Sequence, residues 1–158
     1  MSIDRVRAFM SRYNLQDRIQ EFEQSSATVE LAAEAVGCIP ARTAKTLSFM
    51  VAGAPVLIVA AGDAKVDNSR FKALFHTKAK MLTPDEAVSL VGHAVGGVCP
   101  FAVNEGVKVY LDESLRRFET VFPAAGSSNS AIELNMDELT KLSGGEWIDV
   151  CKAWREEE

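Results

Sequence analysis

Two adjacent glycines and a proline stand in segment 93–101, which reads His-Ala-Val-Gly-Gly-Val-Cys-Pro-Phe. Gly96 and Gly97 can adopt backbone angles that are closed to other residues, and they let a ligand approach the main chain closely. Pro100 fixes its own φ and favours an extended conformation for Cys99. A rigid loop with unshielded amides suits an oxyanion or an ester carbonyl. The alternative is a tight turn that only joins two elements.

A single lysine, Lys45, lies in segment 43–49, which is otherwise apolar or hydroxyl-bearing. A lysine in this setting must extend its amine to solvent, pair with an acid or face a polar cleft. In a cleft it would supply a compact cation for a phosphate, a carboxylate or a developing oxyanion. An edge-strand lysine that faces water is the alternative.

A polar segment, 62–67, directly follows the next predicted strand and contains Asp63, Lys65 and Asp67. These side chains are well placed to form a polar rim around Lys45. They can equally cap the helix that follows, a role that fits Asp67 at least as well.

Several other polar residues have both a functional and a structural interpretation. Cys99 could act as a nucleophile and His93 as a base, but we expect a small apolar filler and a structural hydrogen bond, respectively. Ser127 and Asn129 either contact a substrate or build a turn. The cysteines and histidines form no pairs at zinc spacing, and no phosphate-binding or dinucleotide glycine motif occurs. We therefore expect no metal and no cofactor.

Hydrophobic periodicity and turn residues predict the elements that position these groups. Thr83, Pro84 and two following acids indicate a helix start, and Gly37 a helix end. The irregular alternation of elements predicts an α/β (α+β) fold with a mixed sheet and peripheral helices, rather than a Rossmann fold. The predicted helices span 3–13, 29–36, 68–75, 84–91 and 136–142, and the predicted strands span 18–23, 43–51, 55–61, 107–111, 118–123, 130–135 and 147–150.

The composition is that of a soluble globular protein. The chain has 158 residues, of which 47% are hydrophobic and 25% charged, so we expect one compact domain over residues 1–158. No apolar run approaches the roughly 20 residues of a membrane helix. The first residues do not form a secretory signal. Three widely spaced cysteines favour a reducing compartment, and the expected location is cytoplasmic.

The net charge of −5 is unevenly distributed. The acidic excess lies within residues 133–158, and the rest of the chain is balanced. A local basic stretch can attract phosphate even on an acidic protein, although a solvated lysine face is the alternative. Such a stretch, residues 64–80, carries Lys65, Arg70, Lys72, Lys78 and Lys80 against a single acid, Asp67.

Four segments together resemble the YbaK-like editing proteins, which are related to the insertion domain of bacterial prolyl-tRNA synthetases. The resemblance covers residues 28–142 approximately. It rests on Ala-Lys-Thr-Leu at 44–47, Val-Leu-Ile-Val-Ala-Ala-Gly-Asp at 56–63, the loop from Gly96 to Pro100, and Ala-Ala-Gly-Ser-Ser-Asn-Ser-Ala at 124–131.

The resemblance implies that the mixed sheet is curved and that the protein is a trans-acting deacylase that hydrolyses the ester bond of mischarged aminoacyl-tRNA. The typical substrate is tRNA(Pro) carrying alanine, cysteine, serine or threonine. Lys45 matches the family lysine, and Gly96 to Pro100 match its Gly-x-x-x-Pro motif. The resemblance also implies a mechanism that relies on backbone groups and on the substrate's own functional groups more than on a side-chain nucleophile. The expected partners are the acceptor end of aminoacyl-tRNA and a synthetase, prolyl-tRNA synthetase or another.

The expected pocket combines these features. Amides of segment 96–101 would bind the carbonyl oxygen, and Lys45 would hold the phosphate or ribose of the terminal adenosine. Pocket walls would limit the amino-acid side chain by size. The residues expected to carry catalysis are Lys45, Gly96, Gly97 and Pro100, and those expected to contact the substrate are Phe49, Asp63, Lys65, His93, Val98, Phe101, Gly126, Ser127 and Asn129.

Two rival functions remain open at this point. A non-catalytic module that binds tRNA or a synthetase would bind without ester turnover. A thiol hydrolase would depend on Cys99. The sequence departs from the best-known family members in Cys99 and in an acidic end that contains Trp147 and Trp154.

Overall fold

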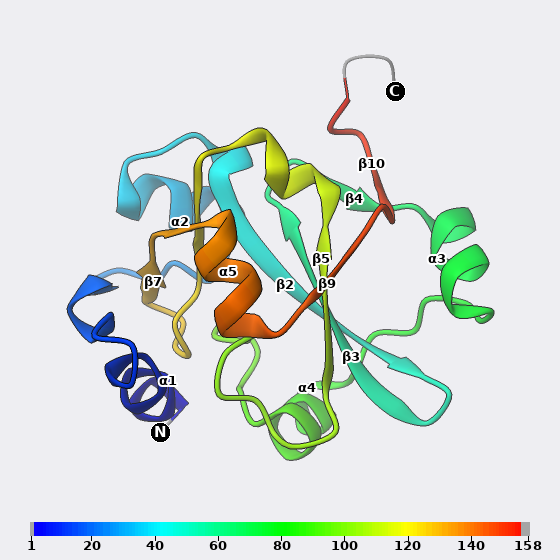
Figure 1. Cartoon of the computed structure of the whole chain (residues 1–158), viewed down its shortest axis with the longest axis horizontal. Coiled ribbons are helices and arrows are strands. Elements are labelled where there is room, and N and C mark those ends of the chain that lie inside the picture. The colour runs from blue at the N-terminus through cyan, green and yellow to red at the C-terminus, as the bar shows by residue number, and fades with distance from the viewer. Residues whose placement is uncertain (1, 156–158) are drawn as a thin grey trace.

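A curved six-stranded sheet with the strand order β8-β6-β2-β3-β5-β9 forms the centre of the molecule (Figure 1). The coordinates are a computed structural model and describe residues 2–155. The sheet is mixed, since β2 pairs antiparallel with β3 but parallel with β6. This confirms the predicted mixed α/β fold. The strands of this sheet are β2 (Thr43–Val51), β3 (Ala54–Ala61), β5 (Lys108–Asp112), β6 (Thr120–Pro123), β8 (Leu134–Asn135) and β9 (Glu146–Ile148).

The β2–β3 hairpin forms the long central pair of the sheet. Ala52 and Gly53 both have positive φ, 51° and 78°, as the tightest hairpin turns require. β3 is buried along nearly its whole length, which explains its uninterrupted apolar sequence. The register places Lys45 opposite Ala60, close to the end of β3. The hairpin therefore fixes the position of Lys45 relative to the loop that follows β3.

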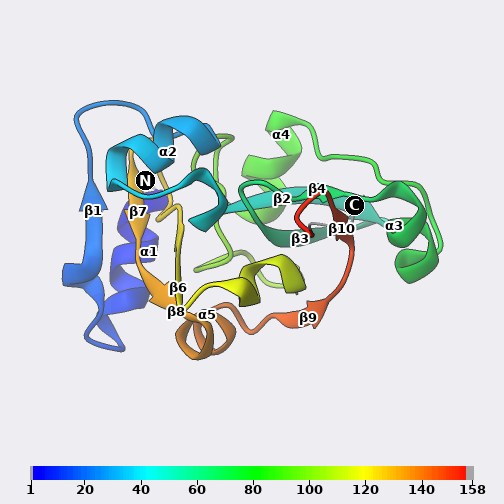
Figure 2. The same cartoon turned by 90° about the horizontal axis from the view of Figure 1, so that it is seen from above.

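Two short antiparallel pairs flank the main sheet, at opposite ends of the molecule in Figure 2. β1 (Ile19–Glu21) pairs with β7 (Ser130–Ile132). β4 (Lys65–Val66) pairs with β10 (Cys151–Lys152). The second pair joins segments that are far apart in sequence and lies beside the end of β3.

The predicted helices are confirmed, and four of them have a capping residue at the start. Thr28 and Asp67 accept hydrogen bonds from the first turns of their helices, and Thr83 and Asn135 form capping boxes with residues three positions later. The α-helices are α1 (Ser2–Ser11), α2 (Val29–Val36), α3 (Asn68–Phe75), α4 (Pro84–Glu86) and α5 (Met136–Ser143). A π-helical turn, Ala87–Val91, continues α4, and 3₁₀ turns span Gln16–Arg18, Pro40–Arg42 and Glu113–Arg117.

Two predicted strands differ from those in the structure. The predicted strand 130–135 is divided at Glu133 into β7, which pairs with β1, and β8, which pairs with β6, and the Glu133 carboxylate accepts from Thr120 Oγ1 at 2.6 Å. The predicted strand 147–150 ends at Ile148 because the buried carboxylate of Asp112 accepts from the Val150 amide at 2.9 Å. The chain then continues into β10.

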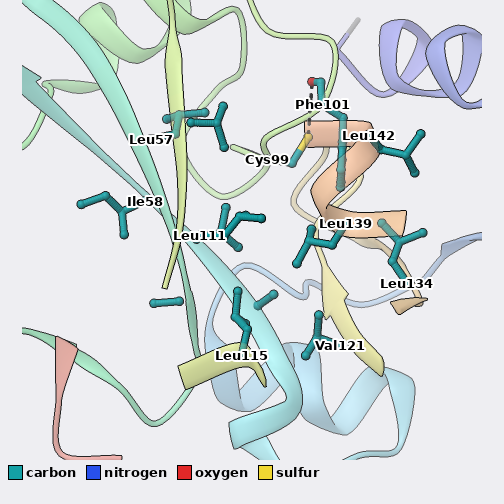
Figure 3. Close-up of a cluster of buried hydrophobic side chains, with 14 of the residues drawn as sticks. Leu57, Ile58, Cys99, Phe101, Leu111, Leu115, Val121, Leu134, Leu139 and Leu142 are labelled. Atoms are coloured by element: carbon teal, nitrogen blue, oxygen red, sulfur yellow. Dashed lines mark hydrogen bonds between the residues drawn. The ribbon is translucent and has the colours of Figure 1, made fainter. Parts of the chain in front are cut away.

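The main hydrophobic core lies between the sheet and α5. Figure 3 shows Leu139 and Leu142 of α5 in one cluster with Phe101 and with Leu111 of the sheet. Burial of such side chains supplies most of the free energy that holds the elements together. Within residues 2–155, no helix is long and apolar enough to cross a bilayer.

Candidate functional site

A pocket of about 350 Å³ opens beside β2 and is bounded by four segments of the chain. One wall is β2 itself, and a second is the start of α2 with the residues before it. The glycine loop and the β6–β7 connection complete it. The lining residues are Ser26, Ala27, Thr28, Val29, Ala32, Ala44, Lys45, Thr46, Leu47, Ser48, Met81, Leu82, Val95, Gly96, Val98, Phe122, Ala124, Ser130 and Ala131.

The Lys45 ammonium lies at one side of this pocket. Its Nζ donates to the carbonyl oxygen of Ala64, and the carbonyl oxygen of Gly62 lies 3.4 Å away. Burial lowers the pKa of Lys45 below its usual value, and nearby Cys151 and Asp63 partly offset this effect. Lys45 is therefore a half-buried cation held by main-chain oxygens.

The glycine loop enters the pocket through Gly96. Gly96 has φ of +93°, a conformation that L side chains rarely adopt, so glycine is required here for backbone reasons. Gly97 is required for a different reason, because a Cβ on it would lie 2.8 Å from the backbone N and Cα of Ser127. The close approach predicted between Gly97 and a ligand is in fact an approach to the chain's own backbone.

Three residues of the glycine loop that line the pocket have amides with no partner within residues 2–155. The amide of Gly97 is used in a turn, since it donates to the Ala94 carbonyl at 3.0 Å. The amides of Val95, Gly96 and Val98, by contrast, donate no hydrogen bond to any described residue. All three residues line the pocket, so their amides are the donors that the loop can offer to a bound oxygen atom.

Thr46 also carries an unsatisfied polar atom. Its Oγ1 is buried and has no hydrogen-bond partner among the described residues, although Thr46 lines the pocket. A buried hydroxyl without a partner is costly unless a ligand or water satisfies it. Thr46 is next to Lys45 in β2, and both residues line the pocket although their side chains leave opposite faces of the strand.

His93 and Cys99 lie in the core behind the loop. The Nε2 of His93 is 2.8 Å from the carbonyl oxygen of Phe101 and 3.6 Å from the Cys99 sulfur. Burial lowers the pKa of His93 and raises the pKa of Cys99 to about 12. Neither residue lines the pocket. Their geometry supports the structural roles, not a nucleophile and its base.

Phe49 and Phe101, which we expected to form pocket walls, belong to the core. Phe49 stacks on Phe71 of α3 with ring centres 5.0 Å apart. Phe101 is fully buried in the cluster with α5 (Figure 3). Phe49 lies on the same face of β2 as Lys45 but four residues further along the strand, where it packs against α3. The apolar wall of the pocket is formed instead by Leu47, Val98 and neighbouring residues.

Asp63 and Lys65 belong to the loop whose carbonyls bind Lys45, but neither residue lines the pocket. Asp63 pairs with Arg117 at 2.5 Å, so its carboxylate is already neutralised. Lys65 is exposed on β4, directly opposite Lys152 of β10. The predicted polar rim therefore consists of carbonyl oxygens, with the side chains turned outward.

Most of loop 124–131, from which we expected substrate contacts, forms a turn that packs against other parts of the chain. Gly126 has φ of +98° and packs against the backbone of Ser2. The hydroxyl of Ser127 donates to Asn129 Oδ1 at 2.9 Å, and Asn129 donates to the carbonyl of Phe22 at 2.8 Å. These three residues build the turn, whereas the flanking Ala124, Ser130 and Ala131 reach the pocket.

Of the predicted site residues, Lys45, Gly96 and Val98 meet in the pocket. Pro100 borders another surface depression, beside Arg5 and Phe9 of α1. Thr46 and the residues before α2, such as Ala27 and Thr28, also line the pocket but were not among the predicted site residues. The position of Thr46 inside the Ala-Lys-Thr-Leu segment could have indicated a place in the site. No motif in the sequence marks the residues before α2.

The chain is similar to several known proteins. Uncharacterized protein YwhH of Bacillus subtilis (strain 168) is 53% identical over 156 residues, which are 98% of this chain and 99% of that protein. The proline–tRNA ligase of the same organism is 27% identical over 127 residues, which are 78% of this chain but 21% of the ligase.

A solved structure described provisionally as a trans-editing enzyme for prolyl tRNA synthetase has a TM-score of 0.87 and 28% identity. The match covers 96% of this chain and 97% of that one. Residues 23–142 match the aminoacyl-tRNA editing domain, a range that includes Lys45, Thr46 and the whole glycine loop. The chain therefore belongs to the aminoacyl-tRNA editing domain family.

Proposed function

We propose that this protein is a trans-acting deacylase that hydrolyses the ester bond between a tRNA and a wrongly attached amino acid. The observation that carries the proposal is the meeting of the Lys45 ammonium and the unpartnered amides of Gly96 and Val98 in one pocket. Membership of the editing domain family supports aminoacyl-tRNA as the substrate class.

The proposed chemistry needs no side-chain nucleophile. An aminoacyl ester is already activated, so the site mainly has to position water and stabilise the tetrahedral oxyanion. The amides of Gly96 and Val98 are placed to donate to that oxygen. The Lys45 ammonium attracts a phosphate or hydroxyl of the terminal nucleotide, and Thr46 Oγ1 offers a further hydrogen bond. Deeply buried Cys99 takes no part.

The surface beside the pocket suits the RNA end of this substrate. Lys65 and Lys152 are both exposed and face each other across the β4–β10 pair, where like charges repel unless an anion lies between them. Phosphates of an acceptor strand supply such anions. Next to the pocket mouth, Met81 and Val95 are 57% and 64% exposed and offer apolar contact area to a ribose or base.

The proposed substrate is tRNA(Pro) carrying a small amino acid. The relation to a proline–tRNA ligase and to the solved structure described above supports this choice of tRNA. The pocket wall is formed by Leu47, Val98 and Ala131, which leave limited room for a side chain. A pocket of this kind rejects larger side chains by size and separates similar ones poorly.

A deacylation panel tests the function directly. The protein is mixed with tRNA(Pro) charged separately with alanine, cysteine, serine, threonine and proline, and loss of the ester is followed over time. We expect rapid hydrolysis of at least one small non-cognate amino acid and slow hydrolysis of the prolyl ester. Saturable binding of every charged tRNA without hydrolysis would contradict a deacylase and favour a non-catalytic tRNA-binding module.

A further inference from the structure

The residues that follow the family match fold back against loop 62–67, which holds Lys45. The matched range ends at residue 142, whereas β10 lies against β4 at the end of the described chain. The amide of Asp67 donates to the carbonyl of Val150 at 2.9 Å. We call residues 150–154 the C-terminal strap. The strap covers the outer side of loop 62–67.

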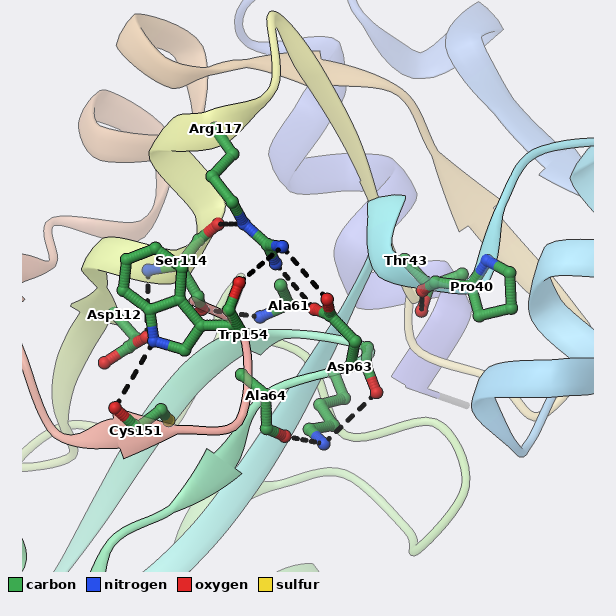
Figure 4. A network of polar contacts seen from close by, with 12 residues as sticks. Pro40, Thr43, Ala61, Asp63, Ala64, Asp112, Ser114, Arg117, Cys151 and Trp154 are labelled. Atoms are coloured by element: carbon green, nitrogen blue, oxygen red, sulfur yellow. Dashed lines mark hydrogen bonds and ion pairs between the residues drawn. The ribbon is translucent and has the colours of Figure 1, made fainter. Parts of the chain in front are cut away.

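Arg117 joins the strap to this loop. Its guanidinium donates to both carboxylate oxygens of Asp63, at 2.5 and 2.9 Å, and to the carbonyl of Trp154 at 3.3 Å. The guanidinium carbon also lies 5.1 Å from the centre of the Trp154 ring. Its Nε donates to the carbonyl of Ser114 at 2.9 Å, which fixes the arginine itself (Figure 4). A bidentate pair of this kind constrains orientation as well as distance.

Asp63, which Arg117 binds, lies in sequence between the two residues whose carbonyls bind Lys45. Gly62 and Ala64 turn their carbonyl oxygens toward Nζ, while the Asp63 side chain turns outward to Arg117. The Gly62 carbonyl belongs to the planar peptide unit that ends at the Asp63 nitrogen, and the Ala64 carbonyl follows two peptide units later, so holding Asp63 in place limits the positions that both carbonyls can take. The Lys45 ammonium is thereby connected to Arg117 and Trp154 through a short rigid segment.

We propose that Arg117, Asp63 and Trp154 form a clamp that positions the Lys45 ammonium in the pocket. The three are positioning residues and do not contact the substrate. The effect on catalysis rests on the proposed function, but the effect on Lys45 itself does not. Removal of the clamp lets loop 62–67 move and releases Nζ from its two carbonyls. A misplacement of about 1 Å at a reacting group can reduce a rate by up to about a hundredfold.

Chemical labelling tests the clamp without any assumption about activity. The wild type and Arg117→Ala are acetylated with a succinimidyl ester at alkaline pH, and modification of Lys45 is followed by mass spectrometry. We expect several-fold faster acetylation of Lys45 in Arg117→Ala, because its amine is no longer held. An unchanged rate would overturn the proposal.

The neighbouring arginine supplies a matched control. Arg116 lies on the same 3₁₀ turn, stacks on Trp147 at 4.1 Å and pairs with Glu113 at 3.1 Å, away from Lys45. Arg116→Ala removes the same chemical groups, and Lys45 should be acetylated as in the wild type. An equal acceleration in Arg116→Ala would show general loosening and would overturn the clamp. Arg117→Lys keeps an ion pair with Asp63 and should restore part of the protection.

Kinetics then connect the clamp to the reaction. Arg117→Ala should lower kcat/KM for the best substrate about tenfold, a loss of the size expected for a misplaced group. In a Lys45→Ala background the same change should add little, because both act through one ammonium. Independent, multiplying losses would overturn the proposal. If the wild type hydrolyses no aminoacyl-tRNA, the proposed function fails, and the acetylation experiment still decides whether the clamp exists.

Discussion

Gly97 lies with its Cα directly against the backbone of Ser127, so close that an added Cβ would be 2.8 Å from the Ser127 nitrogen. The two loops are therefore packed main chain against main chain. This contact sets the position of Gly96 and Val98 at the pocket, because both flank Gly97. The second glycine of the pair thus acts on the pocket through packing.

We predict that Gly97→Ala destabilises the protein. The alanine methyl must push the Gly126–Ser127 backbone away, and overpacking of this type typically costs about 1–3 kcal/mol. Chemical denaturation measures the free energy of unfolding. Ala94→Ser, at an exposed position of the same loop, is the control and should be nearly neutral. Equal stability of Gly97→Ala and the wild type would show that the loops separate without cost.

Alkylation distinguishes a structural Cys99 from a nucleophile. The Cys99 thiol is fully buried, and burial raises its pKa to about 12, so it is protonated at neutral pH and unreactive. We predict that iodoacetamide leaves the native protein active while it modifies the partly exposed Cys38. Cys99→Ala should also retain activity. Inactivation in step with modification of Cys99 would restore the thiol hydrolase hypothesis.

The pH dependence of stability tests the burial of His93. Burial lowers the pKa of His93 in the folded state, so below the ordinary value of about 6.5 the unfolded chain binds a proton that the folded protein does not. Stability should therefore fall as the pH drops through that value. The slope from this one group is at most about 1.4 kcal/mol per pH unit.

His93→Gln should lose this part of the slope between neutral and mildly acidic pH, measured by denaturation at several pH values. The other histidine, His76, is exposed at the end of α3 and provides the control. His76→Asn suits the left-handed backbone at that position and should follow the wild-type curve. If the stability of His93→Gln depended on pH as that of the wild type does, His93 would not be the cause of the loss of stability at acidic pH.

Local sequence signals predicted the elements that carry the pocket. The strands at 43–51 and 55–61, the cap at Asp67 and the helix start at Thr83 depend on neighbours within a few residues, so the sequence reveals them. Lys45 was identifiable for the same reason. It is the single charged residue of an otherwise apolar and hydroxyl-bearing strand.

Long-range packing decided the features that the sequence did not reveal. Phe49 and Phe101 are apolar residues near the right motifs, but partners from α3 and α5 draw both into the core. Asp63 was predicted to face the substrate, yet Arg117, far along the chain, binds its carboxylate. The predicted strand 130–135 is divided at Glu133 between two pairing partners, β1 and β6, that no local pattern indicates.

Pocket selectivity is expected to depend on Val98. Val98 lines the pocket and is half-buried, so Val98→Ala enlarges the space for the amino-acid side chain. The loss of two methyl groups in a size-selective pocket changes discrimination by about 1–3 kcal/mol, or roughly 10- to 200-fold. We predict faster hydrolysis of larger aminoacyl esters relative to alanyl ester in a deacylation panel.

Val88→Ala is the matched control for this panel, since Val88 is exposed on the π-helical turn and does not line the pocket. It should keep the wild-type order of substrates. An unchanged order in Val98→Ala would show that Val98 does not contact the amino acid and would move the selectivity filter to Leu47 or Ala131.

The central claim is that Lys45 serves ester hydrolysis in the pocket it shares with the glycine loop. The most direct measurement is the single-turnover rate of deacylation of alanyl-tRNA(Pro) by the wild type and by Lys45→Ala, with folding checked by circular dichroism. The account predicts that Lys45→Ala folds normally and loses about a hundredfold or more in rate, as expected when a preorganised charge is removed. A well-folded Lys45→Ala that hydrolyses the ester at the wild-type rate would contradict it.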